Sequence, residues 1–196
     1  MLLKPADTEL KESLGAFKID LRTERSEEYI VDKWIIHGPC ELLDPDSYLV
    51  LRRSVASKFD VHPNDVLVVG SAKLGFSISP EKRFRLFCEE SDIDVAVVSS
   101  SLFDEVWTQV LDLKHRGVEW EKAHLFQKYL FDGWIRPDLM PRDYPGLARG
   151  WWDFFRKLTQ STNYDRKVAG GLYKSWHHLE LYHQRAVSGC RQELEG

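Results

Sequence analysis

Two short apolar runs constrain the fold of this chain more than any other feature of its sequence. The runs 66–69 and 93–98 are rich in valine, and turn-forming or polar residues bound both of them. Runs of this length and composition are typical of buried β-strands. The first run ends in Gly70 and Ser71, and the second follows directly from the sequence Ser-Asp. The sequence therefore predicts two core strands that carry polar groups at their ends.

The second predicted strand begins with an Asp-Ile-Asp sequence at residues 92–94. Successive side chains of a strand point to opposite faces, so Asp92 and Asp94 share one face and Ile93 takes the other. Neighbouring carboxylates repel each other unless water or a divalent cation neutralises them, and carboxylate oxygens suit Mg²⁺ that is also bound by substrate phosphates. We therefore predict that Asp92 and Asp94 are ligands of Mg²⁺ or Mn²⁺.

The turn after the first predicted strand has the residues of a phosphate-binding loop. Gly70 lets the backbone approach a ligand, Ser71 offers a hydroxyl and an amide, and Gly75 permits a second unusual backbone angle. Lys73 lies between them and is a further candidate for phosphate binding. The segment is not a Walker A loop, because the pattern G-x-x-x-x-G-K-[ST] is absent. Taken alone, a Gly-Ser pair is often just a turn.

Together, the segments 70–75 (G-S-A-K-L-G) and 91–94 (S-D-I-D) resemble the DNA polymerase β-type nucleotidyltransferase superfamily. This superfamily includes poly(A) polymerases, oligoadenylate synthetases and bacterial antiphage cyclases. The resemblance covers roughly residues 45–140. It implies that Ser71 touches the triphosphate of a nucleotide, and that Asp92 and Asp94 hold two metal ions for in-line attack on the α-phosphate.

The resemblance also implies a third carboxylate on a later strand, which would help bind the catalytic ion and accept a proton. The candidates are Asp132, in F-D-G, and Asp138, in I-R-P-D-L. Neither lies in a clear apolar-Asp-apolar strand. We assign Asp138 as the third catalytic and metal-binding residue, because the preceding Arg-Pro indicates a specific backbone geometry. The alternative is an ordinary aspartate in a turn, in which case the protein would bind a nucleotide without efficient chemistry.

Two further segments carry basic side chains near aromatic ones. Lys82, Arg83 and Arg85 in 76–90 could meet phosphates, but we favour a hairpin or helical turn whose charged face is solvated. In 142–174 basic side chains outnumber acidic ones, which suits a triphosphate or a nucleic-acid backbone. The alternative there is that the tryptophans fill a core and the cations face solvent.

The segment 172–176 (L-Y-K-S-W) is similar to the lysine-bearing helix that follows the catalytic core in many template-independent members of the superfamily. By that resemblance Lys174 would contact the β- and γ-phosphates.

Apolar residues that recur at helical spacing predict helices around the two strands. The predicted helices are 8–17, 46–59, 102–113 and 119–129, with a strand at 130–135 and helical structure again over 164–187. This pattern predicts an α/β (α+β) fold, a nucleotidyltransferase-like mixed sheet flanked by helices, with helical N- and C-terminal extensions. We expect a single domain over 1–196, with its core at about 45–140 and a helical C-terminal part at about 141–190.

Composition excludes several other classes of protein. A chain of 196 residues with 43% apolar and 30% charged residues is ordinary for a soluble domain. A net charge of −4 gives no overall attraction to nucleic acid or to an anionic membrane. Cys40, Cys88 and Cys190 are odd in number and widely spaced, which favours reduced thiols and argues against zinc. With no long apolar run and no leader pattern at its start, the sequence predicts a cytoplasmic protein with no membrane partner.

The function expected from these features is metal-dependent transfer of a nucleoside monophosphate from a nucleoside triphosphate, with ATP as the expected donor. The acceptor would be a hydroxyl of RNA, protein or another nucleotide. The alternatives are a catalytically inactive nucleotidyltransferase-like module that binds or regulates, and a nucleic-acid-binding protein that uses its basic C-terminal segment. Small stand-alone bacterial members of the superfamily often belong to toxin–antitoxin or antiviral systems, and the resemblance extends that expectation here. The acceptor, the base preference and the oligomeric state stay open.

Overall fold

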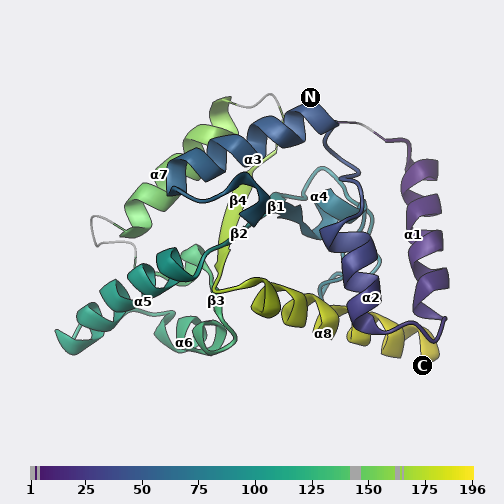
Figure 1. Ribbon diagram of the computed structural model, residues 1–196. Helices are drawn as coiled ribbons and strands as arrows, with labels where there is room; N and C mark the ends of the chain where they lie inside the picture. Colours follow the sequence, from purple (N-terminus) through teal and green to yellow (C-terminus); the bar gives the residue numbers. More distant parts are fainter. Residues whose placement is uncertain (1–2, 4, 142–146, 162–163, 165) are drawn as a thin grey trace.

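Figure 1 shows the computed structural model, which describes residues 3, 5–141, 147–161, 164 and 166–196. The strands are β1 (Val66–Val69), β2 (Ile93–Val98), β3 (Trp134–Ile135) and β4 (Val168–Tyr173). The α-helices are α1 (Asp7–Leu21), α2 (Glu27–Val31), α3 (Pro45–Phe59), α4 (Gly70–Leu74), α5 (Ser100–His115), α6 (Ala123–Phe131), α7 (Leu147–Ser161) and α8 (Trp176–Glu195). A π-helical turn, η1 (Asp32–Ile36), and two 3₁₀ turns, η2 (Pro63–Asp65) and η3 (Pro137–Leu139), complete the described elements.

The strands form a mixed sheet in the order β1-β2-β4-β3. β1 runs antiparallel to β2, β4 runs parallel to β2, and β3 runs antiparallel to β4. In this register Asp94 lies between Val69 on one side and Ala169 on the other. The predicted fold class, a mixed sheet flanked by helices, is confirmed.

The two faces of the sheet are covered by different helices (Figure 1). One core combines α3, α5 and α7 with the strand residues on their side, including Ile93, Val95 and Val97. The other combines α1, α2 and α8 with Leu67, Ala96 and other residues of the opposite face. The alternation along β2 is therefore the one that the sequence predicts, and a hydrophobic layer lies on each side of the sheet.

Local sequence explains why α3 begins and ends where it does. The Asp44 side chain accepts a hydrogen bond of 3.0 Å from the Ser47 amide, and Pro45 occupies the first turn. The helix ends at Phe59, and the next residue, Asp60, adopts the left-handed conformation. Phe59 packs on α7, with its ring 4.4 Å from that of Trp151, so the two helices lie side by side (Figure 1).

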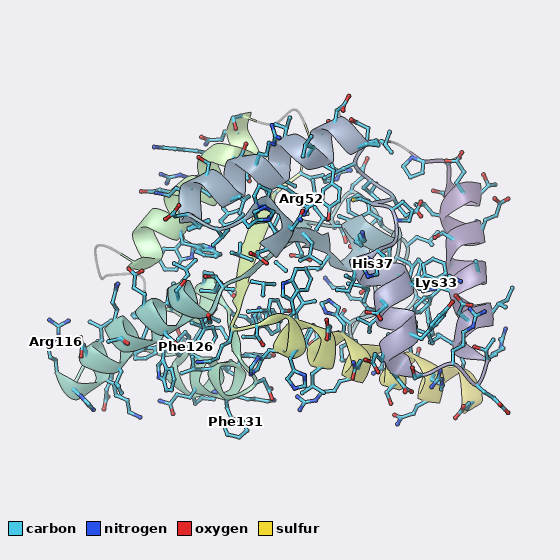
Figure 2. All side chains as sticks on the ribbon, viewed as in Figure 1. Lys33, His37, Arg52, Arg116, Phe126 and Phe131 are labelled. Carbon is cyan, nitrogen blue, oxygen red and sulfur yellow. The ribbon has the colours of Figure 1, made fainter. Side chains whose placement is uncertain are left out.

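The C-terminal part differs from the predicted all-helical segment, because residues 168–173 form β4 in the interior of the sheet. The sequence V-A-G-G-L-Y has a weak strand pattern, since glycine has low strand propensity. Its small residues suit this position, because a Cβ on Gly170 would lie 2.2 Å from Phe155 Cζ. The predicted strand at 130–135 is shorter than expected, since α6 continues to Phe131. Phe131 is 91% exposed, and its side chain points away from the protein (Figure 2).

A buried histidine in α8 makes stability depend on pH. The Nδ1 of His183 lies 2.8 Å from the Leu179 carbonyl oxygen, and burial lowers the pKa of His183 to about 4. Unfolded histidine binds a proton below about pH 6.5, whereas folded His183 does so only near pH 4. The contribution of His183 to the free energy of unfolding should therefore fall by about 1.5 kcal/mol between pH 6.5 and pH 5, while the raised pKa of Asp94 acts in the opposite direction over the same range.

Urea unfolding at several pH values measures this effect. A His183→Leu variant should lack this contribution, so its free energy of unfolding should rise relative to the wild type by about 1.5 kcal/mol as pH falls over that range, and a matched variant at the exposed His124, His124→Gln, should keep the wild-type slope. An unchanged slope in His183→Leu would contradict the prediction.

Candidate functional site: a cavity where β2 begins

A cavity of about 830 Å³ lies at the end of the sheet where β2 begins. Its lining includes Gly70, Ser71, Asp92, Asp94 and Asp138. The structure therefore brings together five of the residues that the sequence singled out, from segments far apart in the chain. The volume is that of a small-molecule site.

The Gly-Ser bend and the Asp-Ile-Asp segment meet because β1 and β2 pair. Val69, the last residue of β1, lies opposite Asp94. Gly70 follows with φ +65°, and a Cβ placed on it would lie 3.2 Å from Asp94 Oδ2. Glycine at this position therefore lets the bend that carries Ser71 lie directly against the Asp94 carboxylate.

Asp92, at the rim of the cavity, forms an ion pair with a lysine. The Nζ of Lys167 lies 3.0 Å from Asp92 Oδ2, and 67% of the lysine side chain is exposed. Lys167 is held there by the backbone, since its carbonyl accepts a hydrogen bond of 2.8 Å from the Ile93 amide. Exposed ion pairs contribute little to the free energy of folding. A ligand or a divalent cation can therefore replace Lys167 as the partner of Asp92 with little loss of stability.

Asp94 is the exposed residue of β2 and opens into the cavity, whose walls partly desolvate its carboxylate. Burial and the neighbouring Asp92 carboxylate raise the pKa of Asp94 to about 6, although Lys167, Arg136 and Lys82 oppose the shift. A raised pKa means that a second negative charge is unfavourable here. Paired carboxylates of this kind fit a hard divalent cation, which would neutralise both.

Both candidates for the third carboxylate, Asp138 and Asp132, are paired with arginines. Asp138 lies in η3 and accepts two hydrogen bonds from Arg136, Nε to Oδ1 at 3.2 Å and Nη2 to Oδ2 at 3.0 Å. Asp132 is paired instead with Arg185 of α8, at 3.0 Å. Across the described ranges, no group of three or more His, Cys, Asp or Glu side chains lies close enough together to hold a metal ion.

The strand beside β2 supplies no carboxylate at the level of the acidic pair. β4 pairs with β2 so that Ala169 lies opposite Asp94, and the next two residues are Gly170 and Gly171. The resemblance implied an acidic residue on a later strand. In this sheet that strand has only small residues beside Asp94.

Two predicted phosphate-binding residues of the turn lie outside the cavity lining. Lys73 is only 1% exposed, and its Nζ donates a hydrogen bond to the Gly38 carbonyl. Because α4 turns by about 100° per residue, Lys73 leaves the helix on the side opposite Ser71. Gly75 ends α4 with φ +83°, and a Cβ there would lie 2.8 Å from Leu10 Cδ2, so this glycine permits close packing of α1.

Lys174 lies at the other end of the sheet. β4 runs parallel to β2 with Tyr173 opposite Val98, so Lys174 is about 16 Å along the strand from the level of Asp94, at about 3.3 Å per residue. Its Nζ forms an ion pair of 2.6 Å with Asp104 of α5. Lys174 precedes α8, which begins at Trp176, whereas the resemblance had placed this lysine on a helix.

The cavity also contains cations that sequence reasoning assigned to solvent or did not single out. Lys82 and Arg85 reach its lining from the 76–90 segment, and Arg136 reaches it from the end of β3. No local pattern marks Arg136, because its place follows from the pairing of β3 with β4. The signal available for Lys82 and Arg85 was their position between the two motifs.

Aromatic side chains line the cavity on both faces of the sheet. Trp151, Trp152 and Phe155 come from α7, while Trp134 and Tyr182 come from the α8 side. The cavity therefore extends past the acidic pair in two directions. Aromatic faces beside cations suit a flat, anionic ligand such as a nucleotide.

Comparisons with protein-family models, with curated proteins and with solved structures find no match to this chain. Among the helices of the described ranges, none has both the length and the apolar content to cross a membrane. The function is therefore inferred from the residues and geometry of the cavity.

Proposed function

We propose that this protein transfers a nucleoside monophosphate from a nucleoside triphosphate to a hydroxyl group, with Mg²⁺ or Mn²⁺. The observation that carries the proposal is the position of Asp94 against Gly70. It puts a carboxylate pair beside a backbone bend that offers an amide and the Ser71 hydroxyl, inside a cavity lined by cations. Carboxylates for the metal and amide donors for phosphate are the two requirements of this chemistry.

Each group of the cavity has a role in this proposal. Asp92 and Asp94 would hold the metal, which when bound neutralises charge on the phosphates and polarises them. Ser71 and the backbone of the bend would bind the phosphate tail, and Lys82 and Arg136 would offset its remaining charge. Most of the rate enhancement would then come from positioning and electrostatic stabilisation.

The α7 side of the cavity provides room for the acceptor. Trp152, Arg156 and Gln160 line it there, next to Lys167. Aromatic side chains stack on bases, and cations bind phosphates. This part of the cavity therefore suits the end of an RNA strand or a second nucleotide. Within this proposal, the acceptor hydroxyl approaches from α7 and the donor lies over the Gly-Ser bend.

A second candidate function is nucleotide binding without efficient transfer. It is favoured by Ala169, the residue opposite Asp94, and by the engagement of Asp138 with Arg136. In this case the cavity would still bind a nucleotide and a metal ion. The protein would act as a sensor or regulator.

One experiment tests both candidates. The protein is incubated with each α-³²P-labelled nucleoside triphosphate, Mg²⁺ or Mn²⁺, and total cellular RNA and protein, and the labelled fraction is identified. Transfer predicts EDTA-sensitive label on one fraction together with pyrophosphate release. Nucleotide binding without label would support the second candidate, and absence of both binding and label would contradict the proposal.

A further inference from the structure

Arg136 lies on the same face of the sheet as Asp94. Trp134 pairs with Tyr173 and Ile135 with Leu172, so alternation places Arg136 on the Trp134 face. Tyr173 lies on this face and pairs with Val98 of β2. Asp94 is four positions before Val98 in the same strand, so its side chain points to the same face. The guanidinium is close enough to Asp94 to oppose the rise in its pKa.

β4 contributes only small residues to the sheet between Arg136 and the acidic pair. At this level β4 contributes Ala169 and Gly171 on the cavity face. Gly171 has no side chain, and a Cβ there would lie 2.7 Å from Trp134 Nε1, so the glycine lets the Trp134 indole pack on the sheet beside Arg136. Small residues therefore form the floor between a cation and two carboxylates.

The Arg136 side chain is held in a defined orientation. Its Nε and Nη2 donate to the two oxygens of Asp138. The guanidinium also lies 5.0 Å from the ring centroid of Tyr129 and 5.3 Å from that of Trp134. A guanidinium fixed by a carboxylate and by aromatic rings loses little entropy when it binds an anion.

We propose that Arg136 is the main phosphate-binding residue of the cavity, and that Asp138 is its positioning residue and not a metal ligand. The inference rests on the proposed function for the identity of the ligand, an anion with several phosphate groups. Lys82 and Arg85 line the same cavity and add positive charge. Arginine binds phosphate through two parallel N–H donors, a geometry that a pre-oriented guanidinium provides.

The contacts of Asp138 support a positioning role. Both of its oxygens accept from Arg136, so a metal ion bound there would have to break two charge-assisted hydrogen bonds. It would also leave the guanidinium of Arg136, whose side chain is 33% exposed, without its carboxylate. Asp138 therefore acts by orienting the Arg136 guanidinium in the cavity.

Calorimetric titration of the full chain with inorganic tripolyphosphate, without metal, tests the phosphate site. Arg136→Gln should weaken binding at least about tenfold, the effect of losing a hydrogen bond to a charged group. Arg136→Lys should restore little, because a lysine lacks the planar fork. Asp138→Asn should weaken binding about threefold or more, which is less than the loss of the guanidinium itself. Arg185→Gln breaks a similar Arg–Asp pair outside the cavity and should leave binding unchanged.

Two further probes, a non-hydrolysable ATP analogue and a short RNA oligomer, distinguish whether Arg136 binds phosphates of the donor nucleotide or of the acceptor. Weaker binding of the ATP analogue by Arg136→Gln assigns the site to the donor nucleotide, and weaker binding of RNA alone assigns it to the acceptor. Either result supports a phosphate site at Arg136. Unchanged affinity of Arg136→Gln for all three probes, with the variant folded by circular dichroism, would overturn the proposal.

Binding of Mn²⁺ alone, followed by electron paramagnetic resonance, tests the role of Asp138. Asp138→Asn should keep the wild-type Mn²⁺ affinity, while Asp94→Asn should lose it. Equal losses in the two variants would make Asp138 a metal ligand and refute the positioning role. Because all these readouts are equilibrium binding, a protein that binds tripolyphosphate through Arg136 but transfers no nucleotide would contradict the proposed function and leave this inference in place.

Discussion

Replacing Asp94 by asparagine should lower metal-dependent nucleotide transfer by at least about 10³-fold, the effect of losing several kcal/mol of metal-assisted stabilisation. Asparagine keeps the shape that packs against Gly70 but removes the charge that would hold the cation. Asp92→Asn should have the same direction of effect. The measurement is the initial rate of labelling from an α-³²P nucleoside triphosphate.

A stability measurement separates this loss from a folding defect. Burial and Asp92 raise the pKa of Asp94 to about 6, so the carboxyl group binds a proton more readily in the folded than in the unfolded chain. The folded state therefore loses stability as pH rises from about 4 through 6, and the full penalty is present at pH 7. Asp94→Asn should accordingly increase the free energy of unfolding at pH 7 while it abolishes transfer.

The matched control is Asp104→Asn, which changes an exposed aspartate at the opposite end of the sheet. This variant should transfer nucleotide at the wild-type rate. If Asp92→Asn and Asp94→Asn both retain labelling, the carboxylate pair has no catalytic role and the proposed function is wrong.

Replacing Gly170 by alanine should destabilise the protein by about 3 kcal/mol, near the upper end for overpacked cores. The new Cβ would lie 2.2 Å from Phe155 Cζ. The Phe155 ring cannot move away easily, because it is buried and packs on Phe59, Trp151 and Phe154. Chemical denaturation followed by tryptophan fluorescence measures the change.

The matched control is Gly15→Ala in α1, where a Cβ would meet nothing within 4 Å. Alanine has the higher helix propensity, so this variant should be more stable by about 0.5–1 kcal/mol. A Gly170→Ala protein as stable as the wild type would show that β4 does not pack tightly against α7.

The parts of the fold that were predictable are those with a strong local pattern. The runs 66–69 and 93–98 are rich in β-branched residues and buried except at Asp94, and α3 has a cap, a proline at its start and an apolar stripe. Such signals depend on neighbours within a few residues, so they survive in any tertiary context. β4 has two glycines and no such pattern, and it forms because β2 and β3 bind it from both sides.

The candidate site divides in the same way. The sequence by itself determined that Asp92 and Asp94 share one strand face and that a glycine bend follows β1, because alternation and backbone freedom are local properties. Only the tertiary structure decided that Lys174 lies beyond the far end of β4 and that Arg136, held by Asp138, lines the same cavity as the acidic pair. Those positions depend on which strands pair and in which register, and long-range pairing of this kind leaves no trace in the residues next to each side chain.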